Sequence, residues 1–383
     1  MSGKIASKKV LLVFGTRPEA IKMAPLVESL SKNFKVMICV TAQHRGMLDQ
    51  VLEIFNLKPD FDLDLMKSNQ DLFSLTSAIL LSLKPIYEQS KPDIILVHGD
   101  TTTAFAAALC AFYSKIPIGH IEAGLRTHDI SSPFPEEANR QLVTRLTTYH
   151  FAPTLNSERN LIKEGVESHK IFVTGNTVID AILSVKDKAN TADYPKALLH
   201  ELPFLENNTQ LGNIKIILVT GHRRENFGKG FAEICKALEM LALSNPLLHI
   251  VYPVHLNPNV KQPVTHMLSH VKNIHLIDPL SYVTFVKLMQ DSYIILTDSG
   301  GIQEEAPSLG KPVLVMRENS ERPEAITAGT ALLVGSNAQE IFSRTQEILD
   351  SEEMYLKMSK AHNPYGDGQA SEIIATKLSK VLL

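Results

Sequence analysis

The sequence predicts an α/β fold of two doubly wound domains, each built on a parallel sheet. Short runs rich in β-branched residues alternate with longer helical patterns along all 383 residues. Most of these short runs are apolar throughout, as in strands that are buried on both faces of a parallel sheet. Alternation of strand and helix implies right-handed βαβ units. The two halves hold about the same number of strands, so we expect two similar domains with a boundary after Gly175.

The expected elements are taken in chain order. Strands are predicted at residues 10–14, 36–41, 94–98, 116–121, 149–152 and 171–173 in the first half. In the second half they are predicted at residues 216–219, 249–253, 274–277, 294–297, 313–315 and 332–334. Helical patterns lie at residues 20–30, 73–89, 102–113, 136–147, 231–243 and 301–309. The first of these helices follows Pro18, a residue that suits the first turn of a helix.

Composition argues against several classes of partner and cofactor. The formal net charge is −3, and no basic excess suggests nucleic acid or an anionic membrane surface. The longest apolar stretch, residues 104–113, is shorter than the roughly 20 residues that span a bilayer, so we expect a cytoplasmic protein. No GxGxxG follows a strand, and the sequence has neither a P-loop nor an HExxH motif. We therefore expect no nicotinamide or flavin cofactor and no metal.

Polar, charged and glycine residues concentrate where the predicted strands end. Ligands of open α/β sheets bind outside the carboxyl ends of the strands, so these residues are the first candidates for a site. The runs are GTRPE from residue 15, HGDTT from 98, IEAGLR from 121, GHRRE from 221 and DSGG from 298. Turn chemistry explains their glycines and prolines, but it explains the accumulated arginine, histidine and carboxylate side chains less well.

The DSGG turn has two features that fit a diphosphate. Gly300 and Gly301 let backbone N–H groups approach an anion, and the N-terminus of the following helix favours negative charge. The first turns of that helix carry Gln303, Glu304 and Glu305, and a carboxylate there can accept hydrogen bonds from ribose hydroxyl groups. A helix N-terminus with favourable charges explains the same residues without a ligand, so the local sequence leaves both interpretations open.

Three acids are candidates for proton transfer. Asp100 and Glu122 follow neighbouring predicted strands, and Glu136 begins a predicted helix after two prolines. Each also has a structural interpretation, because Asp100 can cap the helix that starts at Thr102 and Glu136 can be a first-turn helix acid. Together in one cleft, the like charges of such carboxyl groups would raise the pKa of at least one of them, which suits proton transfer on carbon.

Ten motifs in collinear order resemble the non-hydrolysing UDP-N-acetylglucosamine 2-epimerases of bacteria. They are VFGTRPEAIKMAPL, VTAQH, VHGDTTT, HIEAGLRT, PFPEEANRQ, TGNTVIDA, VTGHRRENFGKG, VYPVHLNPNV, LTDSGGIQEEAPSLGKPVL and ERPEA, from about Val10 to Gln369. The resemblance implies a glycosyltransferase-B type fold, in which two Rossmann-like domains have the active site in the cleft between them. It implies a first domain of residues 1–175 joined by a C-terminal crossover helix within 366–383, and a UDP-binding domain of residues 176–365.

The resemblance also implies an activity and its residues. Members are homodimers that interconvert UDP-N-acetylglucosamine and UDP-N-acetylmannosamine without a cofactor, and the product feeds cell-surface polysaccharides. The matching catalytic residues are Asp100, Glu122, Glu136 and His222. The matching substrate-binding residues are Arg17, Lys22, Ser299, Gly300, Gly301, Glu305 and Arg322. Members can be activated by a second substrate molecule, whose site is matched by Gln43, Arg223 and His255, but Gly46 stands where some members have a polar contact residue.

The mechanism implied by the resemblance is elimination of UDP to a 2-acetamidoglucal, followed by re-addition. Three alternatives stay open: a hydrolysing relative that releases N-acetylmannosamine and UDP, a glycosyltransferase of the same fold, and a non-enzymatic UDP-sugar sensor. Agreement along the whole chain favours the non-hydrolysing pattern. Three cleft acids are also more than a simple glycosyl transfer requires.

Overall fold

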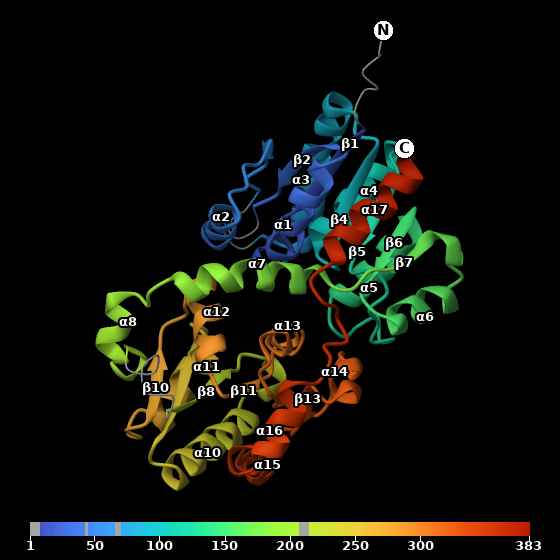
Figure 1. The fold of residues 1–383 in the computed structure, drawn as a ribbon. Helices are drawn as coiled ribbons and strands as arrows, with labels where there is room; N and C mark the ends of the chain where they lie inside the picture. Colours follow the sequence, from blue (N-terminus) through green and yellow to red (C-terminus); the bar gives the residue numbers. More distant parts are fainter. Residues whose placement is uncertain (1–7, 43–44, 66–69, 207–213) are drawn as a thin grey trace. The chain divides into compact units, whose positions relative to one another are not determined.

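The computed structural model describes residues 8–42, 45–65, 70–206 and 214–383, and the chain divides into two compact units (Figure 1). The first unit runs to Ala181 and takes in Tyr365–Leu383, and the second unit is Ile182–Pro364. Helix α7 (Thr177–Thr191) carries the chain from the first unit into the second. No helix within the described ranges is long and apolar enough to cross a membrane.

Seven parallel strands form the sheet of the first unit, in the order β3-β2-β1-β4-β5-β6-β7. They are β1 Lys9–Phe14, β2 Lys35–Val40, β3 Phe61–Asp62, β4 Ile94–His98, β5 Ile118–Ile121, β6 Tyr149–Ala152 and β7 Ile171–Val173. The helices of this unit are α1 Arg17–Ser31, α2 Arg45–Ile54, α3 Leu72–Ser90, α4 Thr102–Tyr113, α5 Glu136–Leu146, α6 Leu155–Lys163 and α17 Ala370–Leu382. Helix α17 packs against α1, so the C-terminal segment belongs to the first unit (Figure 1).

Six parallel strands form the sheet of the second unit, in the order β10-β9-β8-β11-β12-β13. They are β8 Lys215–Thr220, β9 Leu248–Pro253, β10 Ile274–Ile277, β11 Ile294–Thr297, β12 Val313–Val315 and β13 Ala331–Leu333. The helices of this unit are α8 Lys196–Glu201, α10 Lys229–Ser244, α11 Pro258–Leu268, α12 Tyr282–Asp291, α13 Gly300–Glu305, α14 Pro323–Ala328, α15 Ala338–Asp350 and α16 Glu352–Ser359.

The predicted α/β class with two parallel sheets is confirmed. Each of these twelve predicted strands corresponds to a strand of the structure. The alternation of acids with Phe61, Leu63 and Leu65 predicts one more half-buried strand at residues 60–65, of which the structure has the two residues of β3. Each predicted helix is also present, although the first begins earlier than expected and the last is an α-helix only to Glu305, with a 3-10 helix from Ala306 to Leu309. Helix α1 starts at Arg17 because the hydroxyl of Thr16 accepts a hydrogen bond from the N–H of Glu19 and caps the helix.

Two buried histidines make the stability of the first unit depend on pH. His120 on β5 pairs with His150 on β6, and burial lowers the pKa of each to about 3. The unfolded chain takes up these protons below about pH 6.5, whereas the folded chain does not. The contribution of these histidines to the free energy of unfolding is therefore fully present above that pH and is lost as the pH decreases towards 3. We expect each histidine to lower the free energy of unfolding by on the order of 2 kcal/mol between pH 7 and pH 5.

Urea unfolding at the two pH values, followed by circular dichroism, measures this effect. His150→Gln should lose less stability on acidification than the wild-type protein. His270, which is 65% exposed on the second unit, provides the control, and His270→Gln should keep the wild-type pH dependence. Equal losses in the wild-type and His150→Gln proteins would contradict the prediction.

Candidate active site

The strand order reverses beside β1 in the first sheet and beside β8 in the second. β1 lies between β2 and β4, and β8 lies between β9 and β11. Open α/β sheets bind their ligands at such switch points, outside the carboxyl ends of the strands. The runs GTRPE, HGDTT, GHRRE and DSGG follow β1, β4, β8 and β11. The topology therefore brings most of the predicted site residues to two switch points, one in each unit.

A carboxylate of the protein itself fills the N-terminus of α1. Glu19 is 2% exposed and accepts hydrogen bonds from the backbone N–H groups of Gly15 and Thr16, at 3.1 and 2.8 Å. Its other oxygen accepts a hydrogen bond from the Thr101 hydroxyl at 2.7 Å, which ties the turn after β1 to the turn after β4. An anionic ligand at this switch point must therefore be held mainly by side chains, among which the predicted Arg17 opens α1 and is half-buried.

Glu122 follows β5 in a backbone conformation that favours glycine. Its φ is 63°, and such strain in a non-glycine residue clusters at functional sites. Its Oε2 accepts hydrogen bonds from Nζ of Lys22 and from Nδ2 of Asn176, the latter at 2.7 Å. Nε2 of His98 lies 3.8 Å from the same oxygen, and burial lowers the pKa of His98 to about 4, so the ring is neutral at pH 7. Glu122 is thus a nearly buried carboxylate whose charge is balanced by Lys22.

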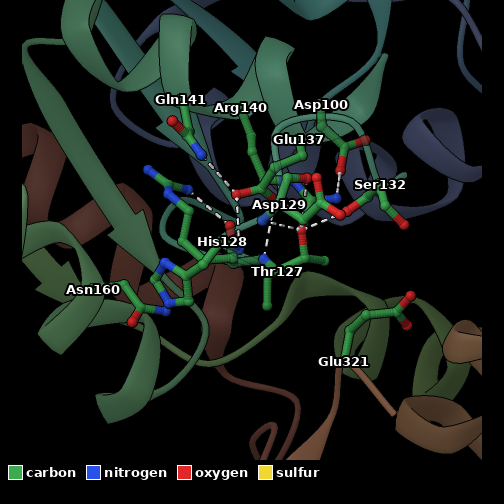
Figure 2. A network of polar contacts seen from close by, with 12 residues as sticks. Asp100, Thr127, His128, Asp129, Ser132, Glu137, Arg140, Gln141, Asn160 and Glu321 are labelled. Atoms are coloured by element: carbon green, nitrogen blue, oxygen red, sulfur yellow. Dashed lines mark hydrogen bonds and ion pairs between the residues drawn. The ribbon is translucent and has the colours of Figure 1, made fainter. Parts of the chain in front are cut away.

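Asp100 follows β4, the strand beside β5, and is held by helix α5 (Figure 2). Nη2 of Arg140 donates to its carboxylate, and Nδ2 of Asn139 donates to its backbone carbonyl oxygen at 2.9 Å. Glu136, the first residue of α5, lies four residues before Arg140 and therefore on the same face of the helix. The structure brings Asp100 and Glu122 to adjacent strand ends and places Glu136 on the helix face that binds Asp100.

Glu137 is a fully buried carboxylate on the same helix (Figure 2). It accepts hydrogen bonds from the backbone N–H groups of Thr127 and His128, at 3.1 and 3.3 Å, and so fixes the loop between β5 and α5. Nη1 of Arg140 lies 3.2 Å from it. Glu137 therefore orients Arg140 towards Asp100, a role that the sequence analysis missed. The three-residue spacing within PEEANRQ was the only signal that these two side chains share a helix face.

Asp298, at the end of β11, holds the turn after β8 in the second unit. Its fully buried carboxylate accepts hydrogen bonds from the backbone N–H groups of His222 and Arg223, each at 2.9 Å. Nδ1 of His222 lies 3.6 Å from the other carboxylate oxygen, and partial burial lowers the pKa of this histidine. The predicted catalytic His222 is thus fixed by an acid that the sequence analysis treated only as part of a turn.

Two of the three residues predicted to bind a second substrate molecule can be located. The ring of His255 stacks on that of His222 with centroids 5.5 Å apart, and Arg223 follows His222 directly. Gln43 lies outside the described residues. Gly46 is exposed on α2, and a Cβ at this position would meet no described atom within 4 Å. The structure therefore places Arg223 and His255 beside His222 and not in a separate part of the second unit.

The turn after β11 combines a glycine backbone with a guanidinium group. A Cβ at Gly300 would lie 2.5 Å from Cζ of Arg322, so glycine leaves the room that this cation needs. Nε of Arg322 donates to the buried carboxylate of Glu304 at 2.8 Å, which fixes its direction. The N-cap of α13, Ser299, makes no side-chain capping bond, in contrast to the filled N-terminus of α1. The other two predicted residues of this turn and helix are Gly301 and Glu305.

The two units therefore carry different chemistry. The first unit places two carboxylates at adjacent strand ends, each with its own cation, and such groups can exchange protons with a bound molecule. The second unit presents a glycine turn, a guanidinium group and a histidine, which are groups that bind phosphate. No cluster of three or more His, Cys, Asp or Glu side chains in the described part of the chain is arranged to hold a metal ion.

Comparisons with known proteins cover nearly the whole chain. A family model described as UDP-N-acetylglucosamine 2-epimerase matches residues 28–379. A UDP-N-acetylglucosamine 2-epimerase of Salmonella typhimurium is 59% identical over 365 residues, which are 94% of this chain and 96% of that protein. The crystal structure of UDP-GlcNAc 2-epimerase from Neisseria meningitidis bound to UDP-GlcNAc is 53% identical, covers 97% of this chain and 100% of its own, and has a TM-score of 0.90. The S. aureus MnaA–UDP co-structure is 47% identical, covers 98% and 97%, and has a TM-score of 0.86.

Proposed function

Because the chain belongs to the UDP-N-acetylglucosamine 2-epimerase family, we propose that it inverts carbon 2 of UDP-N-acetylglucosamine reversibly, without hydrolysing the sugar nucleotide. The observation that carries this proposal is the placement of Asp100 and Glu122 at adjacent strand ends, each held by its own cation. Inversion needs a proton to leave one face of carbon 2 and another to arrive at the opposite face. Two separately fixed acid–base groups meet that requirement.

The proposed chemistry proceeds by elimination, because the proton on carbon 2 is not α to a carbonyl group. The bond between C1 and the UDP oxygen breaks while the C2 proton passes to a carboxylate, which leaves 2-acetamidoglucal and UDP. UDP then adds back to C1 while a carboxylic acid gives a proton to the other face of C2. Asp100, Glu122 and Glu136 are the candidates for these two transfers.

We assign the binding of UDP to the second unit. The backbone N–H groups of residues 299–301 would hold the diphosphate, and Arg322 and His222 would balance the charge that develops on the departing UDP. Glu305 would accept hydrogen bonds from the ribose. Arg17 and Lys22 of the first unit complete the substrate-binding set. The uncapped N-terminus of α13 supports this assignment, because the N-terminus of α1 is filled by Glu19.

The proposal extends to assembly and regulation. By its resemblance to the family, we propose that the chain forms a homodimer, supplies N-acetylmannosamine for surface polysaccharide, and is activated by a second molecule of UDP-N-acetylglucosamine. Stacking of His255 on His222 supports a regulatory site at His255 and Arg223, because a ligand there would lie next to His222, a candidate catalytic residue. Light scattering of the purified protein tests the dimer.

Proton NMR of the purified protein with UDP-N-acetylglucosamine in D₂O tests the activity. We expect UDP-N-acetylmannosamine to appear, with deuterium at C2 of both sugar nucleotides, because the proton that returns comes from solvent. Accumulation of free N-acetylmannosamine and UDP would instead assign the hydrolysing reaction. Failure to exchange the C2 proton would overturn the proposal and favour a transferase or a sensor.

A further inference from the structure

The chain crosses between its two units at two places that lie against each other in the first unit. The backbone N–H of Asn176, directly before the outgoing helix α7, donates to the carbonyl oxygen of Tyr365, the first residue of the returning segment, at 2.7 Å. Gly175 has a φ of 83°, and a Cβ there would lie 3.1 Å from the same carbonyl oxygen. Gly366 has a φ of 126°, and a Cβ added at this position would lie 3.5 Å from the Cα of Gly175. The two crossings therefore touch backbone to backbone, which glycine permits.

Asn176 also reaches from this crossing to Glu122. Asn176 is 3% exposed, and its Oδ1 accepts a hydrogen bond from the N–H of Val178 at 3.0 Å, which satisfies a donor in the first turn of α7. Because that N–H can only donate, the amide must present its NH₂ group in the other direction. Nδ2 donates to Oε2 of Glu122 at 2.7 Å. Both ends of the amide and the backbone N–H are thus fixed, and Oε2 of Glu122 is fixed with them.

We infer that Asn176 is a positioning residue that fixes the carboxylate of Glu122 relative to the two chain crossings. This inference rests on the proposed function. Glu122 follows its strand in a strained conformation, so contacts made by its side chain must hold it in place. Lys22 supplies charge from a long, flexible side chain. Asn176 supplies direction, because its amide is short, planar and fixed at three points. Aspartate could still accept the N–H of Val178 but could not donate to Glu122, and serine would be too short to do both.

Two variants of Asn176 test the inference through kcat, KM and the pH profile. We expect Asn176→Ala to lower kcat about 10- to 100-fold, which corresponds to the loss of one hydrogen bond to a charged group. KM should stay within about threefold of wild type. Asn176→Asp places a second carboxylate beside Glu122, and neighbouring carboxylates resist being ionised together. This variant should lower kcat similarly and also move the acidic limb of the kcat profile to higher pH.

Asp180 provides a control at the same crossing. It is buried on α7 and accepts hydrogen bonds from the backbone N–H groups of Ala370 and Ser371, at 3.2 and 2.8 Å, so it secures the returning segment without contacting Glu122. Asp180→Asn should lower the melting temperature and leave kcat and its pH profile as in the wild-type protein. A merely structural role for Asn176 would make its variants behave in the same way.

The outcomes separate the inference from the proposed function. Wild-type protein that exchanges the C2 proton, together with an Asn176→Asp variant of unaltered pH profile, would overturn the inference alone. An equal shift in the pH profile of Asp180→Asn would also overturn it, because the crossing and not the contact with Glu122 would then be responsible. Wild-type protein without exchange at C2 would overturn the proposed function and the inference with it.

Discussion

Replacement of Glu122 by glutamine is expected to lower turnover of UDP-N-acetylglucosamine by about 10²–10⁴-fold, the usual contribution of a positioned acid or base. The amide keeps the size of the carboxylate but cannot take the C2 proton. Its oxygen can still accept a hydrogen bond from Lys22 or Asn176, so the local fold should persist. Initial rates and C2 deuteration in D₂O, measured by NMR in both directions, provide the readout.

Glu164 offers a matched control for this substitution in the same unit. Its carboxylate is also paired with a buried cation, because Nε and Nη2 of Arg126 donate to it at 2.6 and 2.8 Å. Glu164→Gln should lower stability but leave turnover within about twofold of wild type, since this pair only joins α6 to the loop after β5. Near-normal turnover of Glu122→Gln would remove Glu122 from the proton transfers.

The sheets were predictable because burial on both faces leaves a simple pattern. Strands such as β4 and β11 consist almost wholly of apolar residues, and their predicted bounds match the structure. β3 was not predicted at its true length, because two residues are too few for any periodicity. Three longer helices, α7, α11 and α15, of 15, 11 and 13 residues, were not predicted. Helices α2, α6 and α12 were also missed. Each has about ten residues or fewer, so its apolar face repeats only two or three times before the pattern ends.

Position along the chain suggested candidate site residues mainly where they follow strands. Asp100, Glu122 and His222 follow β4, β5 and β8, and parallel topology sends those ends to one edge of each sheet. The partners that fix them come from distant segments. Asn176 lies 54 residues from Glu122 in the sequence, and no local spacing of residues indicates that contact. The positive φ of Glu122 was equally hidden, because the usual signal of that conformation is glycine.

Adjacent residues on α5 show a further limit of reading the sequence. Glu136 and Glu137 are chemically identical neighbours, yet one is half-buried and the other is fully buried against the loop from Thr127. Successive side chains on a helix point about 100° apart, so the direction of the core decides which glutamate is structural. That direction comes from packing against other segments, which a single sequence does not reveal.

Replacement of Arg140 by methionine is expected to lower the free energy of unfolding by about 3–5 kcal/mol, as when one partner of a buried ion pair is removed. Arg140 is 9% exposed and contacts both Asp100 and Glu137. Asp100 can recover some hydration, because its side chain is 25% exposed. Glu137, at 0% exposure, would be left with hydrogen bonds from the backbone N–H groups of Thr127 and His128 and from the amide of Gln141, all of them neutral donors. Urea unfolding at pH 7 measures the loss.

The double variant Arg140→Met/Glu137→Gln tests whether the unpaired charge of Glu137 causes the loss of stability in Arg140→Met. Removing the charge of Glu137 should restore about 1–2 kcal/mol relative to Arg140→Met, a coupling typical of residues in direct contact. Arg344, paired with Glu340 on the surface of α15, gives the exposed comparison, and Arg344→Met should cost less than about 1 kcal/mol. If the double variant is less stable than Arg140→Met alone, packing of the Arg140 side chain and not its charge holds α5 against the turn at Asp100.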